Sequence, residues 1–166
     1  AYVRMGAMSA PVIAPGDLAD PRVLRLLEQH LADMHAASPP ESVHALDVAG
    51  LRHPSVTFWV LREGDEVLGC VALKELDAGH GELKTMRTDA AARGRGFGRL
   101  LLAHVVSEAR ARGYARLSLE TGVEDFFRPA RALYRAAGFT PTGPFGGYRP
   151  DPNSVFLTLD LAADPS

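Results

Sequence analysis

Apolar residues recur every three or four positions in three parts of the chain, the spacing that buries one face of a helix. The first run covers residues 21–37 and follows Asp20, whose side chain can cap the helix. Pro21 occupies the first helical position. The second run ends at Gly113, and the third opens at Pro129 and ends at Gly138. Glycine just beyond the last turn is typical of a helix C-terminus. The pattern therefore predicts three helices.

Other segments have the composition or the alternation of strands. Two runs rich in β-forming residues, 56–62 and 66–76, flank the turn signal Glu63-Gly64-Asp65 and predict an antiparallel hairpin. Three further strands are predicted, at residues 82–88, 115–121 and 154–161. Apolar and polar residues alternate in the last of these, as they do in a half-buried strand.

The order of elements favours one α/β domain. Helix, three strands, helix, strand, helix and strand follow one another, which fits a mixed sheet flanked by helices better than a sandwich or a bundle. The 166 residues suit a single core, and 46% apolar with 23% charged residues is ordinary globular usage. Residues 1–10 read as a tag or a non-native start, so we assign the domain to residues 11–166. Residues 41–54 are expected to form a short helix or an ordered loop.

Charge and composition exclude several classes of protein. A net charge of −2 argues against nucleic-acid binding, which needs a cationic excess. The sequence contains no run of about 18 apolar residues, so no membrane span is predicted. It does not begin with the basic-then-apolar pattern of a signal peptide, so we expect a cytoplasmic protein. The single cysteine, Cys70, lies in an apolar run, so we expect its thiol to be buried. Six histidines lack metal-ligand spacing, so no metal is expected.

The most informative segment is a glycine-rich turn between a predicted strand and a long helix. It reads Arg93-Gly94-Arg95-Gly96-Phe97-Gly98-Arg99. Glycines let the backbone approach a bound group closely, at a point where the first amides of a helix have no partner. These amides and the helix dipole favour an anion, in particular a pyrophosphate. Three arginines add positive charge around this turn.

Other phosphate-binding motifs fit this segment less well. A Walker loop requires Lys-Ser or Lys-Thr after its last glycine, and neither follows here. The spacing G-x-G-x-G differs from the Rossmann G-x-G-x-x-G, and the hairpin upstream is wrong for a βαβ unit. An RNA-binding RNP1 strand would continue with stacking aromatic residues, whereas leucines follow here. A glycine turn with incidental surface arginines remains an alternative.

Three motifs in order resemble the GNAT superfamily of acetyl-CoA-dependent N-acetyltransferases. Residues 82–88 are similar to the family's E-L-K-x-M-x-V strand, and Arg93, Gly96 and Gly98 match its phosphate turn [QR]-x-x-G-x-[GA]. Residues 133–139 are similar to its L-Y-x-x-x-G-F block. Residues 41–47 and 145–152 look like a bacterial subgroup that acts on small molecules. The resemblance implies a central, mostly antiparallel twisted sheet flanked by helices.

The resemblance also implies a cofactor site, with acetyl-CoA as co-substrate in a cleft where two strands splay apart. The pantetheine arm would pair with backbone groups of Met86, Arg87 and Thr88. The pyrophosphate would be held by the turn, at Arg93, Gly94, Arg95, Gly96, Phe97, Gly98 and Arg99. An amine would then attack the thioester directly in a ternary complex, without a metal or a covalent enzyme intermediate.

Catalytic roles follow from the same resemblance. Tyr134 occupies the position of the family's tyrosine, which would protonate the departing thiolate; alternatively its ring only packs in the core. Glu82 would act as the general base through water, with His44, His80 and Glu120 as competing candidates. One departure is that the loop 122–127 offers no asparagine for the pantetheine.

The acceptor is expected to be the primary amine of a small molecule. His44 is expected to shape the acceptor pocket, Phe126 to line it or to pack in the core, and Arg149 to pair with an acceptor carboxylate. Two other functions remain open: a protein N-acetyltransferase, and a non-catalytic acyl-CoA sensor. By analogy with the family, the strand at residues 154–161 could pair with its copy in a homodimer.

Overall fold

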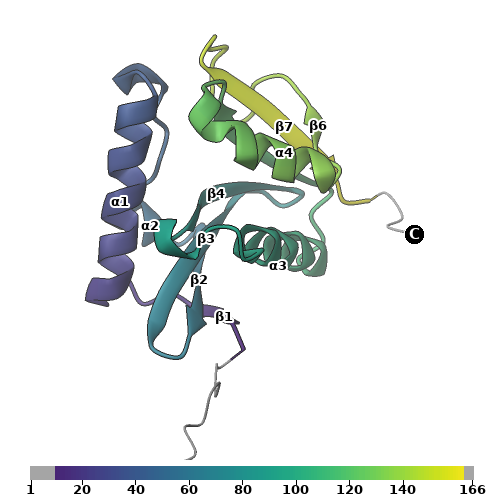
Figure 1. Ribbon diagram of the computed structural model, residues 1–166. Helices are drawn as coiled ribbons and strands as arrows, with labels where there is room; N and C mark the ends of the chain where they lie inside the picture. The colour runs from purple at the N-terminus through teal and green to yellow at the C-terminus, as the bar shows by residue number, and fades with distance from the viewer. Residues whose placement is uncertain (1–9, 163–166) are drawn as a thin grey trace, which may run out of the picture.

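The computed structural model describes residues 10–162, whose strands form one mixed sheet of seven strands in the order β1-β2-β3-β4-β5-β7-β6 (Figure 1). The strands are β1 (Val12–Pro15), β2 (Val56–Glu63), β3 (Glu66–Asp77), β4 (His80–Thr88), β5 (Arg116–Gly122), β6 (Thr140–Pro141) and β7 (Ser154–Asp160). Within the described chain, β4 and β5 form the one parallel pair, and the other neighbours are antiparallel. The prediction of a mixed, mostly antiparallel sheet is confirmed.

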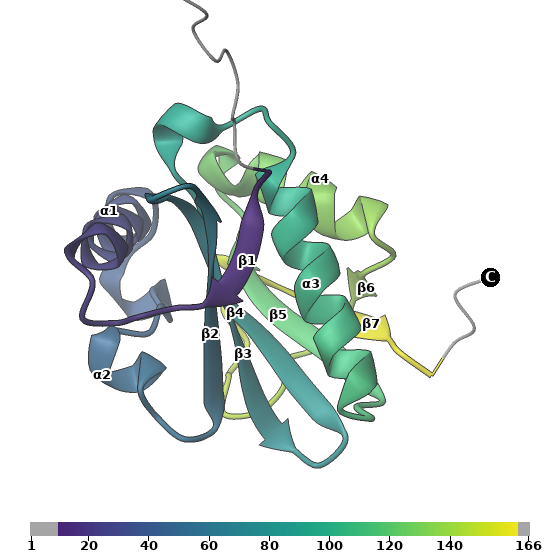
Figure 2. The same cartoon turned by 90° about the horizontal axis from the view of Figure 1, so that it is seen from below.

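Helices cover both faces of this sheet, as Figure 2 shows. The helices are α1 (Pro21–Ala37), α2 (Val48–Leu51), α3 (Phe97–Ala111) and α4 (Arg128–Ala136). Single 3-10 turns lie at η1 (Pro40–Ser42), η2 (Ala90–Ala92) and η3 (Asp125–Phe127). Helices α1 and α2 lie on one face, and α3 and α4 lie on the other. No helix within residues 10–162 has the length and apolar character that a membrane crossing requires.

The alternation of side chains along β3 explains why there are two hydrophobic clusters. Cys70 and Ala72 pack with residues of α1 and α2, whereas Val71 and Leu73 pack with residues of α3. Successive strand residues point to opposite faces, so one strand supplies both cores. The thiol of Cys70 is fully buried, as expected, and this burial raises its pKa to about 12.

The segment boundaries follow the sequence signals closely. Asp20 caps α1, with its carboxylate accepting a 2.9 Å hydrogen bond from the amide of Arg22, and Gly113 follows α3 at φ +80°. Residues 41–54 hold the end of η1 and all of α2. Two strands were not predicted, β1 and β6. Both are short and contain proline, and neither has the length on which an alternating pattern can be recognised.

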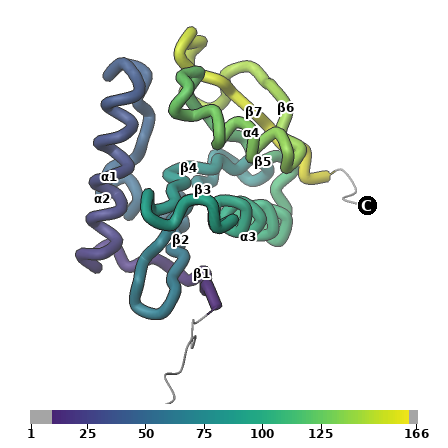
Figure 3. The backbone as a smooth tube through the Cα atoms, viewed as in Figure 1, coloured from purple at the N-terminus to yellow at the C-terminus, as the bar shows by residue number. Residues whose placement is uncertain are grey.

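A divergence of two neighbouring strands creates the space for a site. Strands β4 and β5 pair only where His80–Glu82 face Arg116–Ser118. Beyond these residues β4 continues beside β3 and β5 continues beside β7, as the tube in Figure 3 shows. Thr85 lies at a bulge in β4, with a φ of +53° that is strained for a β-branched residue. Such strain is often found at functional sites.

Candidate active site

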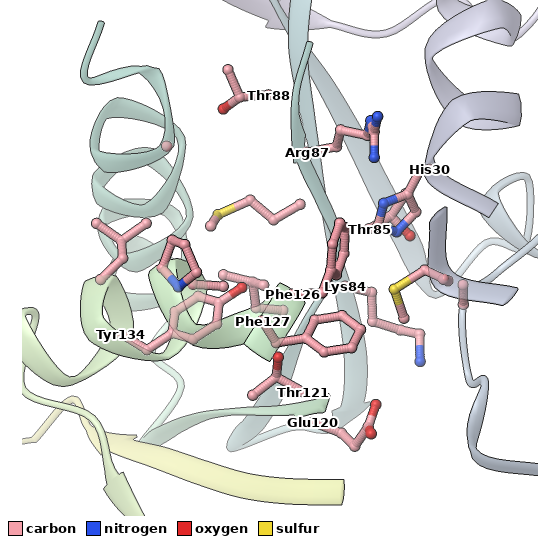
Figure 4. Close-up of a pocket in the computed structure, with 18 of the residues that line it drawn as sticks. His30, Lys84, Thr85, Arg87, Thr88, Glu120, Thr121, Phe126, Phe127 and Tyr134 are labelled. Carbon is pink, nitrogen blue, oxygen red and sulfur yellow. The ribbon is translucent and has the colours of Figure 1, made fainter. Parts of the chain in front are cut away.

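A cleft of about 510 Å³ occupies the gap between the diverging strands β4 and β5. Helix α1 contributes His30 and Met34 to its lining from one face of the sheet, and α4 contributes Leu133 and Tyr134 from the other. The cleft therefore reaches both faces of the sheet. Figure 4 shows Tyr134 on one side of β4, with Arg87 and His30 on the opposite side.

The glycine-rich turn forms one end of this cleft, lined by Arg93, Gly94, Gly96, Phe97 and Gly98. Gly94 and Gly96 have φ values of +83° and +81°, a left-handed conformation that favours glycine. A Cβ added at either glycine would have no heavy atom of the described chain within 4 Å. Gly96 is the N-cap of α3, so the helix presents its unpaired first amides beside the cleft. This arrangement suits a phosphate group.

The arginines of the turn differ in where their side chains lie. Arg93 lines the cleft. Arg95 points elsewhere: its guanidinium donates a 2.6 Å hydrogen bond to Glu63 and lies 4.6 Å from the centre of the Phe97 ring. Arg99 is exposed and does not contribute to the lining. Of the three arginine side chains expected around the turn, the structure brings one to the cleft.

Tyr134 lies on α4 with its ring buried beside Phe139, at a centroid distance of 5.9 Å. Its hydroxyl points into the cleft (Figure 4). Burial raises the pKa of this phenol, and the charge of Glu120 raises it further, so the group stays protonated at neutral pH. The side chain therefore packs and also presents a proton donor to the cleft.

Glu82 is nearly inaccessible and belongs to a three-membered polar cluster. The phenol of Tyr148 donates a 2.6 Å hydrogen bond to Oε2 of Glu82. The ammonium of Lys84 lies 3.3 Å from the same oxygen and 2.9 Å from the Tyr148 hydroxyl. This cluster, Glu82–Lys84–Tyr148, holds a carboxylate and an ammonium together at the cleft wall.

Glu120 faces the cleft from β5, across from β4. Ser154 donates a 2.7 Å hydrogen bond to its Oε2. Burial raises the pKa of this carboxyl above its ordinary value. A carboxylate with raised proton affinity is suited to accept a proton from an amine.

A second charged group lines the cleft on the side of α1. Arg87 is buried, and its Nη1 lies 2.6 Å from Oδ2 of Asp33 on α1. His30, also on α1, lines the cleft nearby, and its pKa is lowered to about 4 by burial and by the charge of Arg87. Its ring is therefore neutral at neutral pH, and the positive charge on this side belongs to Arg87.

The remaining expected residues are divided between the cleft and the surface. Met86, Thr88, His44 and Phe126 line the cleft, whereas the side chain of Arg149 does not. His80 is buried away from it, with Nε2 at 2.6 Å from the hydroxyl of Ser118.

Sequence reasoning did not identify the roles of four lining residues: His30, Lys84, Thr85 and Tyr148. Tyr148 lies in the segment 145–152 that was already singled out, but nothing in the sequence indicates that this segment folds back onto β4. The segments 41–47 and 145–152 are joined by a 2.7 Å hydrogen bond from Ser42 to Asp151. They contribute His44, Ala45 and Tyr148 to the lining of the cleft.

Comparison with known proteins agrees with the fold. The model of the acetyltransferase (GNAT) family matches residues 23–139. N-acetyltransferase YsnE of Bacillus subtilis is 52% identical over 145 residues, which are 87% of this chain and 96% of that protein. N-acetyltransferase YedL of Escherichia coli is 48% identical, over 90% of this chain and 94% of that protein. A crystal structure described as an acyl-CoA N-acyltransferase of Klebsiella pneumoniae superposes with a TM-score of 0.77 at 30% identity, covering 91% and 97% of the two chains.

The chain belongs to the GNAT acetyltransferase family. It is an N-acetyltransferase, and acetyl-CoA is the acyl donor that this family uses.

Proposed function

We propose that this enzyme transfers an acetyl group from acetyl-CoA to the primary amine of a small molecule, by direct attack in a ternary complex. The proposal rests on one observation: two features that the reaction needs lie on the same cleft. The glycine turn before α3 supplies free amides for a pyrophosphate, and the buried Tyr134 directs its hydroxyl into the same cavity. A phosphate anchor and a proton donor are the two groups that a thioester donor requires.

The turn and β4 would hold the donor. The amides that follow Gly96 and the side chain of Arg93 would bind the pyrophosphate. The edge of β4 at Met86–Thr88 faces the cleft and lacks a strand partner within the described chain on that side, so its backbone groups are available to the amides of a pantetheine arm. This use of a free strand edge is β-augmentation.

The proposed reaction conserves atoms and charge. The free amine attacks the thioester carbon, the carbon–sulfur bond breaks, and the sulfur leaves with the electron pair of that bond. Tyr134 donates its proton to the departing sulfur. The proton that the amine must lose passes to a carboxylate, for which Glu82 is the proposed base through water and Glu120 is the competing candidate. Each proton transfer typically increases the rate about 10²–10⁴-fold.

A small acceptor is favoured over a protein by the two linked segments that line the cleft. The segment 145–152 places Tyr148 on the cleft wall, and the Ser42–Asp151 hydrogen bond ties this segment to residues 41–47. A peptide would require an open groove there. A non-catalytic acyl-CoA sensor would not require Tyr134 to present its hydroxyl to the cleft.

The proposal is tested first by calorimetric titration with acetyl-CoA and desulfo-CoA, with NADH as control. We expect micromolar binding of both CoA compounds and none of NADH. Thiol release in the presence of a panel of small amines then tests catalysis. CoA binding without thiol release from any amine or peptide would favour the sensor, and release only with peptides would favour protein acetylation.

A homodimer through β7 stays a prediction. The short strand β6 pairs with β7 at Thr158 and Leu157, so part of the edge that a partner strand would use is already occupied. Sedimentation of the purified protein tests this directly.

A further inference from the structure

Two buried polar groups on the α1 side of β4 have no partner within the described residues. They are Nε of Arg87 and the hydroxyl of Thr85. Both residues are more than nine-tenths buried, and both line the cleft. A buried donor without a partner destabilises the fold unless something else supplies an acceptor. Two such groups beside one cavity are therefore available to a ligand.

The geometry of the guanidinium indicates what kind of ligand this is. Asp33 contacts Nη1 of Arg87 at 2.6 Å, while the Nε side of the planar group has no partner in residues 10–162. An arginine presents its donors as a fork that matches the two oxygens of a carboxylate. The hydroxyl of Thr85, two residues earlier on the same strand, can donate one further hydrogen bond to such an anion.

Each charged pair on this side of the cleft leaves a different set of donors for a ligand. Lys84 is paired with Glu82, and Asp33 takes Nη1 of Arg87, so Nε is the Arg87 donor that stays without a partner in residues 10–162. His30 is neutral at neutral pH, and His44 and Glu120 line the same cleft. A ligand whose ammonium or amine lies toward Glu120 and whose anion lies toward Arg87 would match both signs.

We infer that Arg87 and Thr85 form a carboxylate-binding subsite, and that the acceptor is therefore a primary amine that carries a carboxylate, such as an amino acid. This inference rests on the proposed function and narrows it to one substrate class. The side chain of Arg87 then acts on the acceptor, whereas its backbone remains on the edge of β4 assigned to the cofactor. The apolar lining residues Met34, Ala45 and Phe126 would contact the remainder of the acceptor.

The competing explanation is structural, namely that Arg87 only ties α1 to β4 through Asp33. Two variants separate the explanations. Arg87→Gln removes the fork, and Asp33→Asn removes the ion pair but keeps the guanidinium. If the ion pair alone matters, both variants behave alike. If the subsite exists, only Arg87→Gln loses affinity for the acceptor carboxylate. Asp33→Asn then binds the carboxylate as tightly as the wild type, or more tightly.

The experiment uses matched acceptors: L-phenylalanine, L-leucine and L-methionine, each beside its carboxamide. Wild-type protein should acetylate the acids with a kcat/KM at least tenfold above that of the amides. In Arg87→Gln the ratio of kcat/KM for the acids to kcat/KM for the amides should fall at least tenfold, mainly through a higher KM for the acids. If Arg87→Gln does not fold, Arg87→Lys keeps the charge without the fork and should give the same selective loss.

A binding measurement avoids dependence on turnover. The CoA-bound protein is titrated with N-acetyl-L-phenylalanine and with its amide. Preference for the acid that disappears in Arg87→Gln supports the subsite. Equal affinity for acid and amide, or an equal loss of both in the variant, overturns it. Failure of the proposed function is distinguishable, because it appears earlier as absent acetyl-CoA binding or absent thiol release with every amine.

Discussion

The phenol of Tyr148 reaches Glu82 across 66 residues of chain and donates a 2.6 Å hydrogen bond to its Oε2. Lys84 contacts both groups, so the carboxylate is held in one orientation at the cleft wall. Neither partner is adjacent to Glu82 in the sequence. The orientation of the proposed base therefore depends on the segment 145–152 as well as on β4.

Replacing Tyr148 by phenylalanine tests this dependence. A hydrogen bond to a charged group contributes about 1.5–3 kcal/mol, so kcat should fall by about tenfold to a hundredfold while acetyl-CoA binding is unchanged. Steady-state kinetics and a calorimetric titration with acetyl-CoA provide the measurement.

Tyr114→Phe is the matched control. Tyr114 also donates to a carboxylate, at 2.8 Å to Glu75, but it does not line the cleft. Its loss should affect stability and leave kcat unaltered. Equal kinetic effects of the two substitutions would contradict a positioning role for Tyr148.

The Tyr148 contact also shows what the sequence reveals and what it leaves hidden. Periodicity and glycine signals are local, so the strands β2 to β5 and β7, the three long helices and the glycine turn before α3 were predictable from residues close together in the chain. The partnership of Tyr148 with Glu82 depends on how a loop without periodicity folds back onto a strand. Arg95 shows the same limit, since only the folded hairpin brings Glu63 close enough to draw it away from the cleft.

Tyr134→Phe separates proton donation from packing. The ring remains beside Phe139, so the melting temperature should change little, while kcat should fall about 100-fold or more. Because burial raises the Tyr134 pKa, the wild-type phenol stays protonated through pH 9, and Tyr134 should cause no decline of kcat below that pH. Single-turnover thiol release measures the effect, and a kcat close to wild type would assign Tyr134 to packing alone.

Gly96→Leu tests the phosphate turn, with Gly113→Leu as a matched control at the other end of α3. Both glycines have φ near +80°, and neither has a described atom within 4 Å of an added Cβ. Each substitution should therefore cost a similar 1–2 kcal/mol, roughly the penalty of a left-handed residue. Only Gly96 lines the cleft, so only its variant should lose acetyl-CoA binding in a calorimetric titration. Retained affinity in Gly96→Leu would remove the turn from the site.

The two neighbouring arginines allow a comparison of side-chain position alone. Arg93→Gln should weaken acetyl-CoA binding about tenfold, the scale of one charge-assisted hydrogen bond. Arg95→Gln should leave the affinity near wild type, since that side chain is bound to Glu63 outside the cleft. The difference should shrink at high salt, because ions screen exposed charges. A larger effect at Arg95 would mean that its side chain leaves Glu63 when the cofactor binds.

His30 should make the protein less stable in mild acid. Its pKa is about 4 in the folded state, against an ordinary value of 6.5, because burial and the charge of Arg87 disfavour the imidazolium. A group with a depressed folded pKa supports the fold above its unfolded pKa, and that support is lost as pH falls from 6.5 toward 4. The shift corresponds to about 3 kcal/mol, which should appear as a fall in the free energy of unfolding between pH 7 and pH 4. Urea titrations of wild type and His30→Gln at both pH values isolate this contribution, since the carboxylates that also titrate are common to the two proteins. The decrease should be smaller in the variant by roughly that amount, and an identical decrease in both proteins would show that His30 is already solvated at the cleft wall.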